Sequence, residues 1–93
     1  MQVVVTHEYH LAYRQLPTKL QKIVDAKIEQ LHTNLAHPSL HIHRHRKAKD
    51  RNVWICHINR AIRLLFQIKN GIIYLWNVGT HRIEDRINIA LFA

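Results

Sequence analysis

Three residues in the second half of the chain, His57, Arg63 and His81, have side chains suited to chemistry on a phosphodiester. A neutral imidazole can take the proton from a ribose 2′-hydroxyl, and a protonated imidazole can give one to the leaving 5′-oxygen. A guanidinium can stabilise the extra negative charge of the transition state. Together these groups could cleave an RNA backbone without a metal ion, provided that the fold brings them to one place.

The first third of the sequence predicts one strand followed by two helices. The β-branched run Val3–Val5 is typical of a strand. Apolar residues then recur at helical spacing until Pro17, which ends the first helix. Thr18 and Gln21 match a capping box at the start of a second helix. The predicted elements are a strand over residues 2–6, a helix over 7–16 and a helix from 18 to about 34.

The remaining sequence predicts strands, because after residue 38 the hydrophobic period becomes two. Asn70-Gly71 is a strong signal for a two-residue hairpin turn. Helical spacing returns only near the C-terminus. The predicted elements are an edge strand over 40–46, a basic loop over 47–52, strands over 53–58, 62–68 and 72–78, and a short helix over 82–92.

This element order predicts an α+β fold with a single sheet and helices packed on one face. It comprises an N-terminal strand, a helical hairpin, an antiparallel four-stranded meander and a short C-terminal helix. A chain of 93 residues is large enough for one hydrophobic core only. We therefore expect a single domain over residues 1–93.

The apolar faces of the strands fix the register of the first hairpin. Matching those faces pairs Cys56 with Leu64 and leaves a three-residue loop at 59–61. His57 then lies opposite Arg63. A two-residue loop would turn Arg63 toward the helices, where loss of hydration costs several kcal/mol, so the three-residue loop is favoured.

The last hairpin brings the third residue to the same region. Counting back from its Asn-Gly turn places Arg63 opposite Val78, and His81 follows three residues later. His57, Arg63 and His81 are thus predicted to meet at one rim of the sheet, away from the helix-covered face. A histidine at a sheet rim is more often a partly exposed polar residue than a catalyst, so it is the convergence with Arg63 that favours a functional role.

A basic strip lies near the middle of the chain. The formal net charge is +8, so the natural partner is an anion such as nucleic acid. The strip fits contacts with RNA phosphates, although charged side chains also protect an edge strand from pairing with other chains. Its residues are Arg44, Arg46, Lys47, Lys49 and Arg51.

Three alternating histidines, His41, His43 and His45, overlap this strip and raise the question of a metal site. Imidazole is a common ligand for zinc and copper. Side chains two residues apart on a strand are separated by roughly 6–7 Å, which is wide for one shared ion. No acidic residue or cysteine lies within the ladder. We therefore expect no metal site there and assign these histidines to the basic strip.

The composition excludes several classes of protein. The single cysteine, Cys56, allows neither an intramolecular disulfide nor a CxxC zinc motif. Only two glycines are present, so a P-loop or a GxGxxG nucleotide-binding turn is absent. No apolar run approaches the roughly 20 residues that span a bilayer, and no signal peptide is recognisable. We expect a cytoplasmic protein that has no membrane partner and no small-molecule cofactor.

The segment VWICHINRAIRLLFQIKNGIIYLWNVGTH, together with the helical hairpin before it, resembles the RelE/ParE superfamily of bacterial toxins from type II toxin–antitoxin pairs. The likeness extends over nearly the whole chain. Its most specific parts are the arginine in IRLLFQI and the closing VGTH. The CHI tripeptide followed by GTH is most similar to the YafQ branch, whose ribonuclease site is based on histidine.

The resemblance implies a metal-independent endoribonuclease that cuts messenger RNA at the ribosome, inhibits translation and is neutralised by a cognate antitoxin. Arg63 matches the arginine that stabilises the transition state, and His81 matches the basic residue after VG. His57 matches the catalytic histidine of the YafQ branch, and His45 falls near a further histidine of that branch.

An alternative keeps the same fold without nuclease activity, as a ParE-like gyrase inhibitor or a binding module. Trp54 and Cys56 stand where the RelE branch has strand lysines, and Ala61 stands where the YafQ branch has an aspartate. These departures favour the alternative and leave the general base open. The predicted convergence of His57 and Arg63 with a second histidine favours the ribonuclease.

Overall fold

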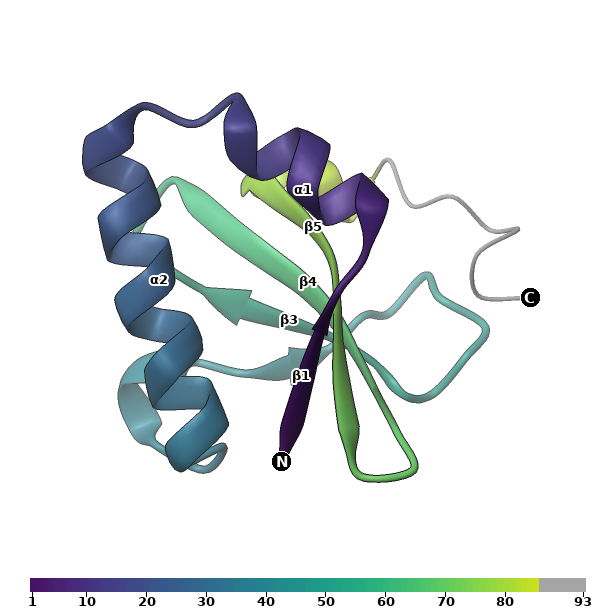
Figure 1. Cartoon of the computed structure of the whole chain (residues 1–93). Coiled ribbons are helices and arrows are strands. Elements are labelled where there is room, and N and C mark those ends of the chain that lie inside the picture. The colour runs from purple at the N-terminus through teal and green to yellow at the C-terminus, as the bar shows by residue number, and fades with distance from the viewer. Residues whose placement is uncertain (86–93) are drawn as a thin grey trace.

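The computed structural model describes residues 1–85, which form one mixed sheet with helices against it (Figure 1). The five strands lie in the order β1-β5-β4-β3-β2. The elements are β1 (Gln2–Val5), α1 (His7–Arg14), α2 (Thr18–Thr33), the 3₁₀ helix η1 (Pro38–Leu40), β2 (His43–Arg44), β3 (Val53–His57), β4 (Ile62–Lys69), β5 (Ile72–Thr80) and the 3₁₀ helix η2 (His81–Glu84).

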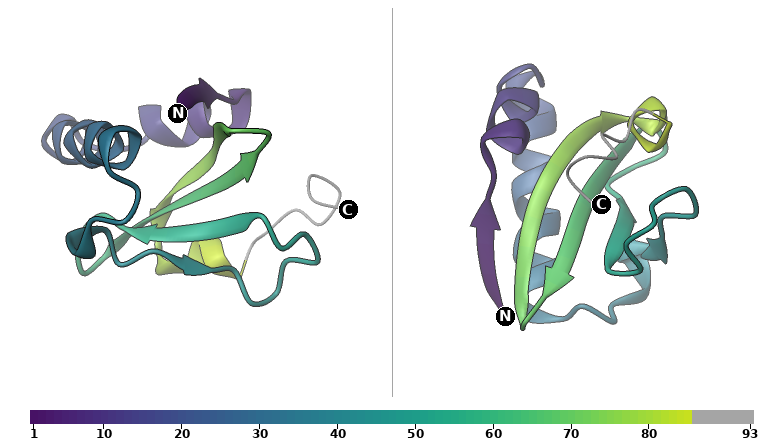
Figure 2. Two further views of the ribbon diagram at one scale, coloured as in Figure 1. Left: turned by 90° about the horizontal axis from the view of Figure 1, so that it is seen from below. Right: turned by 90° about the vertical axis from the view of Figure 1, so that its right-hand side faces the viewer.

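The predicted α+β class and the antiparallel meander are confirmed. Strands β2 to β5 pair antiparallel in chain order, and β1 joins the edge of the sheet parallel to β5. Figure 2 shows α1 and α2 on one face of this sheet and η2 on the other. No helix in residues 1–85 is long and apolar enough to cross a membrane.

Each face of the sheet has its own apolar packing. Under α1 and α2 the core includes Val24, Leu31, Leu64 and Phe66, all essentially inaccessible to water. On the opposite face a smaller cluster joins Val53, Ile55 and Leu65 to Ile83 of η2. Because side chains alternate along a strand, the even-numbered residues of β4 lie in the first core and the odd-numbered ones lie on the opposite face of the sheet, the face that carries η2.

The predicted register of the first hairpin is confirmed. Cys56 pairs with Leu64 and His57 with Arg63. The loop is held by the side-chain oxygen of Asn59, which accepts hydrogen bonds from the backbone N–H groups of Ala61 and Ile62, both at 2.8 Å. The sequence-predicted pairing of the catalytic candidates His57 and Arg63 is therefore present in the structure.

The predicted register of the last hairpin is wrong by one residue at its far end. Its Asn-Gly turn has positive φ at both residues, as a type I′ turn requires. Further along, a bulge lies between Leu65 and Phe66, so that Arg63 pairs with Gly79 rather than Val78. The cause is apolar patterning in β5: Leu75 and Val78 are both buried in the helix-side core although they are three residues apart. One extra residue in β5 between them allows both side chains to point into that core.

The predicted edge strand over 40–46 is also wrong in extent, because only His43 and Arg44 form β2. Residues 38–40 make a 3₁₀ turn instead, in which the ring Nδ1 of His37 accepts a hydrogen bond from Ser39 N at 3.2 Å. His41 follows with a left-handed φ of 46°. Local side-chain hydrogen bonds thus compete successfully with the extended conformation.

The predicted capping box at the start of α2 is wrong. The N-cap is Pro17 and makes no side-chain cap, while the amide of Gln21 donates to the backbone oxygen of Tyr13 at 3.0 Å. That bond ties α2 to the end of α1. Of the predicted helix over 82–92, residues 82–84 belong to η2, and residues 86–92 lie outside the described residues.

Candidate active site

The cross-strand pair of His57 and Arg63 forms the base of the site, on the sheet face opposite the two long helices. One terminal nitrogen of Arg63 donates to the backbone oxygens of Asn59 at 2.8 Å and of Arg60 and Ile62 at 3.2 Å. Two of these carbonyls come from the hairpin loop and one from the first residue of β4, and together they hold the guanidinium of Arg63, the cross-strand partner of His57. The Nε atom of Arg63 lies 3.6 Å from a carboxylate oxygen of Glu84, an ion pair that joins β4 to η2.

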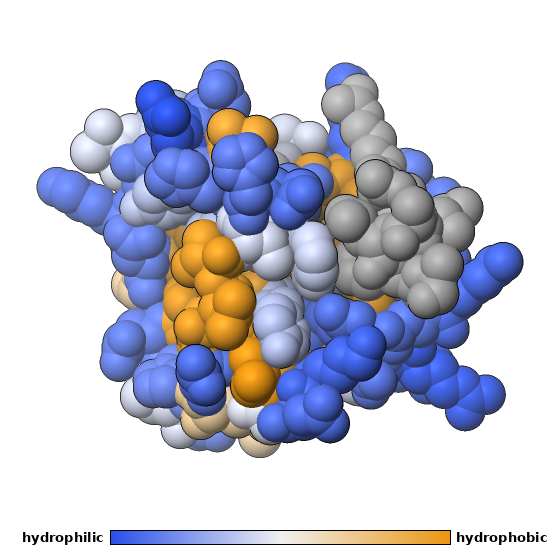
Figure 3. All heavy atoms as spheres, turned by 45° about the vertical axis from the view of Figure 1, so that its right-hand side comes forward, coloured by the Kyte–Doolittle hydropathy of each residue, from blue (hydrophilic) through white to orange (hydrophobic). Residues whose placement is uncertain are grey.

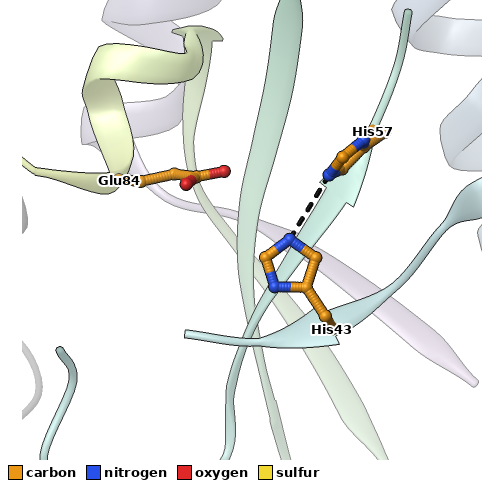
Figure 4. A group of neighbouring side chains, drawn as sticks. All are labelled: His43, His57 and Glu84. Atoms are coloured by element: carbon orange, nitrogen blue, oxygen red, sulfur yellow. Dashed lines mark hydrogen bonds between the residues drawn. The ribbon is translucent and has the colours of Figure 1, made fainter. Parts of the chain in front are cut away.

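Strand β2 brings a second imidazole to the same place. His43 pairs with Ile55, so its side chain shares a sheet face with His57, two residues further along β3. The two rings meet edge to face, and their Nε2 atoms are 3.3 Å apart. Figure 4 shows this pair with Glu84 across from it. The ring of His41 lies 5.9 Å from that of His57, measured between centroids. His43 and Glu84 were not predicted from the sequence as members of this site.

The hydrogen bonds assign a tautomer to each of the two imidazoles. His43 Nδ1 lies 3.2 Å from the backbone oxygen of Arg44; since a carbonyl only accepts, Nδ1 carries the proton. His43 Nε2 then accepts from the Nε2–H of His57. The remaining lone pair is on His57 Nδ1, which makes no hydrogen bond with another described residue.

The surroundings of His57 favour its neutral form. Burial is the main reason that its pKa is lowered from the usual value, and the positive charge of Arg63 and the neighbouring His43 act in the same direction. Glu84 acts in the opposite direction but does not outweigh them. A neutral imidazole with a free lone pair is the form that a general base requires.

His45, predicted as a catalytic candidate, is buried and fully engaged with the backbone. Its Nε2 lies 2.7 Å from the backbone oxygen of Glu84 and therefore donates to it. Its Nδ1 accepts from the backbone N–H groups of Lys47 and Ala48, both at 3.1 Å. The ring thus connects the basic loop to η2 and holds Glu84 in place, which is the geometry of a positioning residue.

His81, the third predicted residue, is the first residue of η2, three positions before Glu84. Its side chain is exposed and makes no hydrogen bond or ion pair within residues 1–85. The structure therefore brings His57 and Arg63 together with His43 and Glu84, and leaves His81 free at the start of the adjacent turn.

A groove of about 700 Å³ leads from this cluster along the basic loop. Arg44, Arg46 and Lys47 line it together with His43 and His57, and all five residues of the basic strip are exposed. Figure 3 shows hydrophilic side chains projecting from this side of the molecule. Glu84 and Asp85 line the groove as well, so its cationic side chains outnumber its carboxylates by three to two. A groove with excess positive charge that ends at paired imidazoles suits a phosphate backbone.

The loop beside the groove is anchored to the sheet by a polar chain. Asp50 accepts from the side chain of Gln67 at 2.7 Å and from the backbone N–H of Asn52 at 2.8 Å. Gln67 in turn accepts from the indole N–H of Trp76 at 3.2 Å. The hydrogen bond from Asn52 is the main reason that the pKa of Asp50 is lowered. At the other end of the loop, Lys47 forms an ion pair with Asp85.

The sheet order and the two helices on one face are those of the RelE/ParE-like toxin fold. The structure is similar to YafQ from E. coli strain BL21(DE3), with a TM-score of 0.72 and 10% identity over 99% of this chain and 98% of that one. It is also similar to a YoeB/ParE toxin from Agrobacterium tumefaciens, with a TM-score of 0.71 and 12% identity over 87% of this chain and 99% of that one.

A third similar structure is the E. coli DinJ-YafQ toxin-antitoxin complex, with a TM-score of 0.63 and 11% identity over 88% of this chain and 93% of that one. In sequence, no family model and no curated protein matches this chain. The likeness is therefore one of fold, and it confirms the fold that the sequence resemblance predicted.

Proposed function

We propose that this protein is a RelE-like toxin, a metal-independent endoribonuclease that cleaves messenger RNA at the ribosome and so inhibits translation. The observation that carries the proposal is the fixed pair of His57 and Arg63, with an unpaired imidazole nitrogen, at the end of a basic groove. The fold shared with YafQ and YoeB/ParE toxins supports it.

In this mechanism His57 is the general base. Its Nδ1 takes the proton of the 2′-hydroxyl, the 2′-oxygen attacks phosphorus, and the bond to the 5′-oxygen breaks. Arg63 stabilises the charge of the transition state. His81 gives a proton to the leaving 5′-oxygen. The products are a 2′,3′-cyclic phosphate and a free 5′-hydroxyl.

His43 and His45 act through other groups. The Nε2 atoms of His43 and His57 are only 3.3 Å apart, too close for the two rings to serve opposite sides of the phosphorus, as an in-line displacement requires. His43 instead fixes the tautomer and orientation of His57. His45 holds η2, and with it His81 and Glu84, against the loop.

The proposed partner is a cognate antitoxin. A net charge of +8 and an exposed groove call for an acidic or helical segment that covers the site, and the DinJ-YafQ structure is a toxin-antitoxin complex of the same fold. Co-expression with an adjacent short reading frame followed by pull-down tests this part. Absence of a complex would remove the support for a toxin–antitoxin pair.

The decisive experiment for the activity is messenger RNA cleavage in a reconstituted translation reaction. Each of His57→Ala, Arg63→Ala and His81→Ala is expected to slow cleavage by roughly 10²-fold or more, and the triple variant should leave no cyclic-phosphate ends. Circular dichroism checks that the variants fold, and His32→Ala, an exposed residue of α2, is the matched control.

Two outcomes would contradict the proposal. Cleavage that persists in the folded triple variant would reject this site. An intact messenger RNA with the wild-type protein, together with inhibition of DNA gyrase, would establish the ParE-like alternative instead.

A further inference from the structure

We propose that His43, His57 and Glu84 form a Zn²⁺ site that, when loaded, switches off the ribonuclease. Each of these side chains offers one ligand atom, and the three atoms all lie within 4.8 Å of one another (Figure 4). His43 is exposed, and His57 and Glu84 are half-buried. An ion can therefore reach the cluster from solvent. This set differs from the ladder of His41, His43 and His45, because two of its members come from β3 and η2.

The spacing of the two imidazoles already fits a tetrahedral ion. Zinc binds histidine nitrogen at about 2.0–2.1 Å, and two such bonds at the tetrahedral angle place the nitrogens about 3.3–3.4 Å apart. The two Nε2 atoms are 3.3 Å apart. A right-angled pair of ligands, as in square-planar or octahedral sites, would place the nitrogens only about 2.8–3.0 Å apart. The geometry therefore favours Zn²⁺, and rotation about the side-chain bonds of Glu84 supplies the third ligand.

Hydrogen bonds from neighbouring groups orient the proposed ligands, as they do in known metal sites. His43 donates its Nδ1–H to the backbone oxygen of Arg44 and so presents the lone pair of Nε2 to the cluster. The backbone of Glu84 is held by His45 at 2.7 Å. Arg63 competes with a metal ion for the carboxylate of Glu84. At 3.6 Å this ion pair is long, so the carboxylate can leave Arg63 to bind the ion. One ligand position stays open for water, as in zinc sites that exchange with solvent.

Loading the ion changes the protonation of His57. In the free protein its Nε2 carries the proton shared with His43; coordination needs that lone pair, so the proton moves to Nδ1. The lone pair of His57 that takes the 2′-hydroxyl proton is then lost, and His57 no longer serves as the general base. The inhibitory role rests on the proposed function, whereas the binding site does not.

The binding experiment uses untagged, metal-stripped protein and no RNA. Titration calorimetry with ZnCl₂ is expected to show one ion per chain, and Co²⁺ as a probe should give the visible absorption of a tetrahedral site. His43→Ala, His57→Ala and Glu84→Gln should each weaken Zn²⁺ binding by more than about 100-fold, beyond the loss typical of supporting residues alone. His32→Ala is the control and should bind as the wild type does.

The activity experiment adds ZnCl₂ to the wild-type cleavage reaction. Cleavage should stop at one equivalent and return when EDTA is added, while Mg²⁺ should not inhibit. If the wild type does not bind Zn²⁺, or if the three ligand variants bind it as tightly as the wild type, the proposed site is wrong. Binding at the site without any cleavage by the metal-free protein overturns the proposed function and leaves the zinc site standing. Cleavage that proceeds with the site loaded overturns the inhibitory role.

Discussion

The two faces of the sheet are held by different kinds of interaction. Under α1 and α2 the contacts are apolar and continuous, from Val24 and Leu31 on α2 to Phe66 on β4. On the opposite face the apolar cluster is small, and directional hydrogen bonds from His45 and Gln67 hold the basic loop and η2 in place. Apolar packing tolerates small shifts of its members, whereas a hydrogen bond does not.

This difference separates stability from activity. The helix-covered face supplies most of the buried area and hence most of the free energy of folding. The polar face places His57, Arg63 and Glu84 with little help from apolar packing. Changes on the first face should therefore alter how much protein is folded, and changes on the second should alter what the folded protein does.

The largest expected effect is on stability and comes from Phe66→Ala. Phe66 is fully buried in the helix-side core, and such truncations cost about 3–5 kcal/mol. Urea denaturation measures the loss. Cleavage per folded molecule should stay near that of the wild type, because no atom of the site is changed. A loss of activity in variant protein shown to be folded would contradict the separation of the two faces.

The same difference explains how much could be predicted from the sequence. Apolar alternation fixed the register that pairs His57 with Arg63, since a slip would expose the core. The bulge at Trp76 was not predicted. Its cause is the three-residue spacing of Leu75 and Val78, which is recognisable only when both are known to be buried in the same core. Glu84 and His43 were not predicted as site residues, because a two-residue strand and a 3₁₀ turn have no hydrophobic periodicity. The position of Glu84 beside His43 depends on a hydrogen bond from His45, which the sequence pattern does not indicate.

The next effect concerns the basic strip. Replacement of Arg44, Arg46, Lys47 and Lys49 by Ala should weaken RNA or ribosome binding and reduce the slope of log K against log salt by about 3 if each contacts one phosphate. Filter binding across a salt series measures both. Lys19→Ala with Lys22→Ala, both exposed on α2, is the control for charge alone. An unchanged slope in the fourfold variant would leave the strip with a role in solubility only.

A smaller effect is expected from His45, and it distinguishes a positioning residue from a catalytic one. His45→Ala leaves the N–H groups of Lys47 and Ala48 without their acceptor, which should lower the free energy of unfolding by about 1–3 kcal/mol. His45→Asn restores an acceptor for these N–H groups, and His45→Gln can place an amide donor near the Glu84 backbone oxygen that Nε2 contacts; neither side chain exchanges protons near neutral pH. Stability is expected to recover in the Asn variant and cleavage in the Gln variant; loss of cleavage in both folded variants would make His45 a proton donor or acceptor.

The smallest expected effect is on the pH dependence of stability, and it comes from Asp50, which anchors the basic loop to the sheet. Hydrogen bonds from Asn52 and Gln67 hold the pKa of Asp50 below its unfolded value of about 3.9. The stabilisation is therefore complete when the pH is above the pKa of Asp50 in the unfolded chain, and it is lost as the pH falls through the lower pKa of Asp50 in the folded protein. Asp50→Asn should be slightly less stable than the wild type at neutral pH, with a difference that closes below about pH 4. Chemical denaturation over a pH series, with Glu29→Gln on α2 as the control for charge, measures it. A difference that persisted at low pH would come from packing of the loop, and the carboxylate would then have no part in anchoring it.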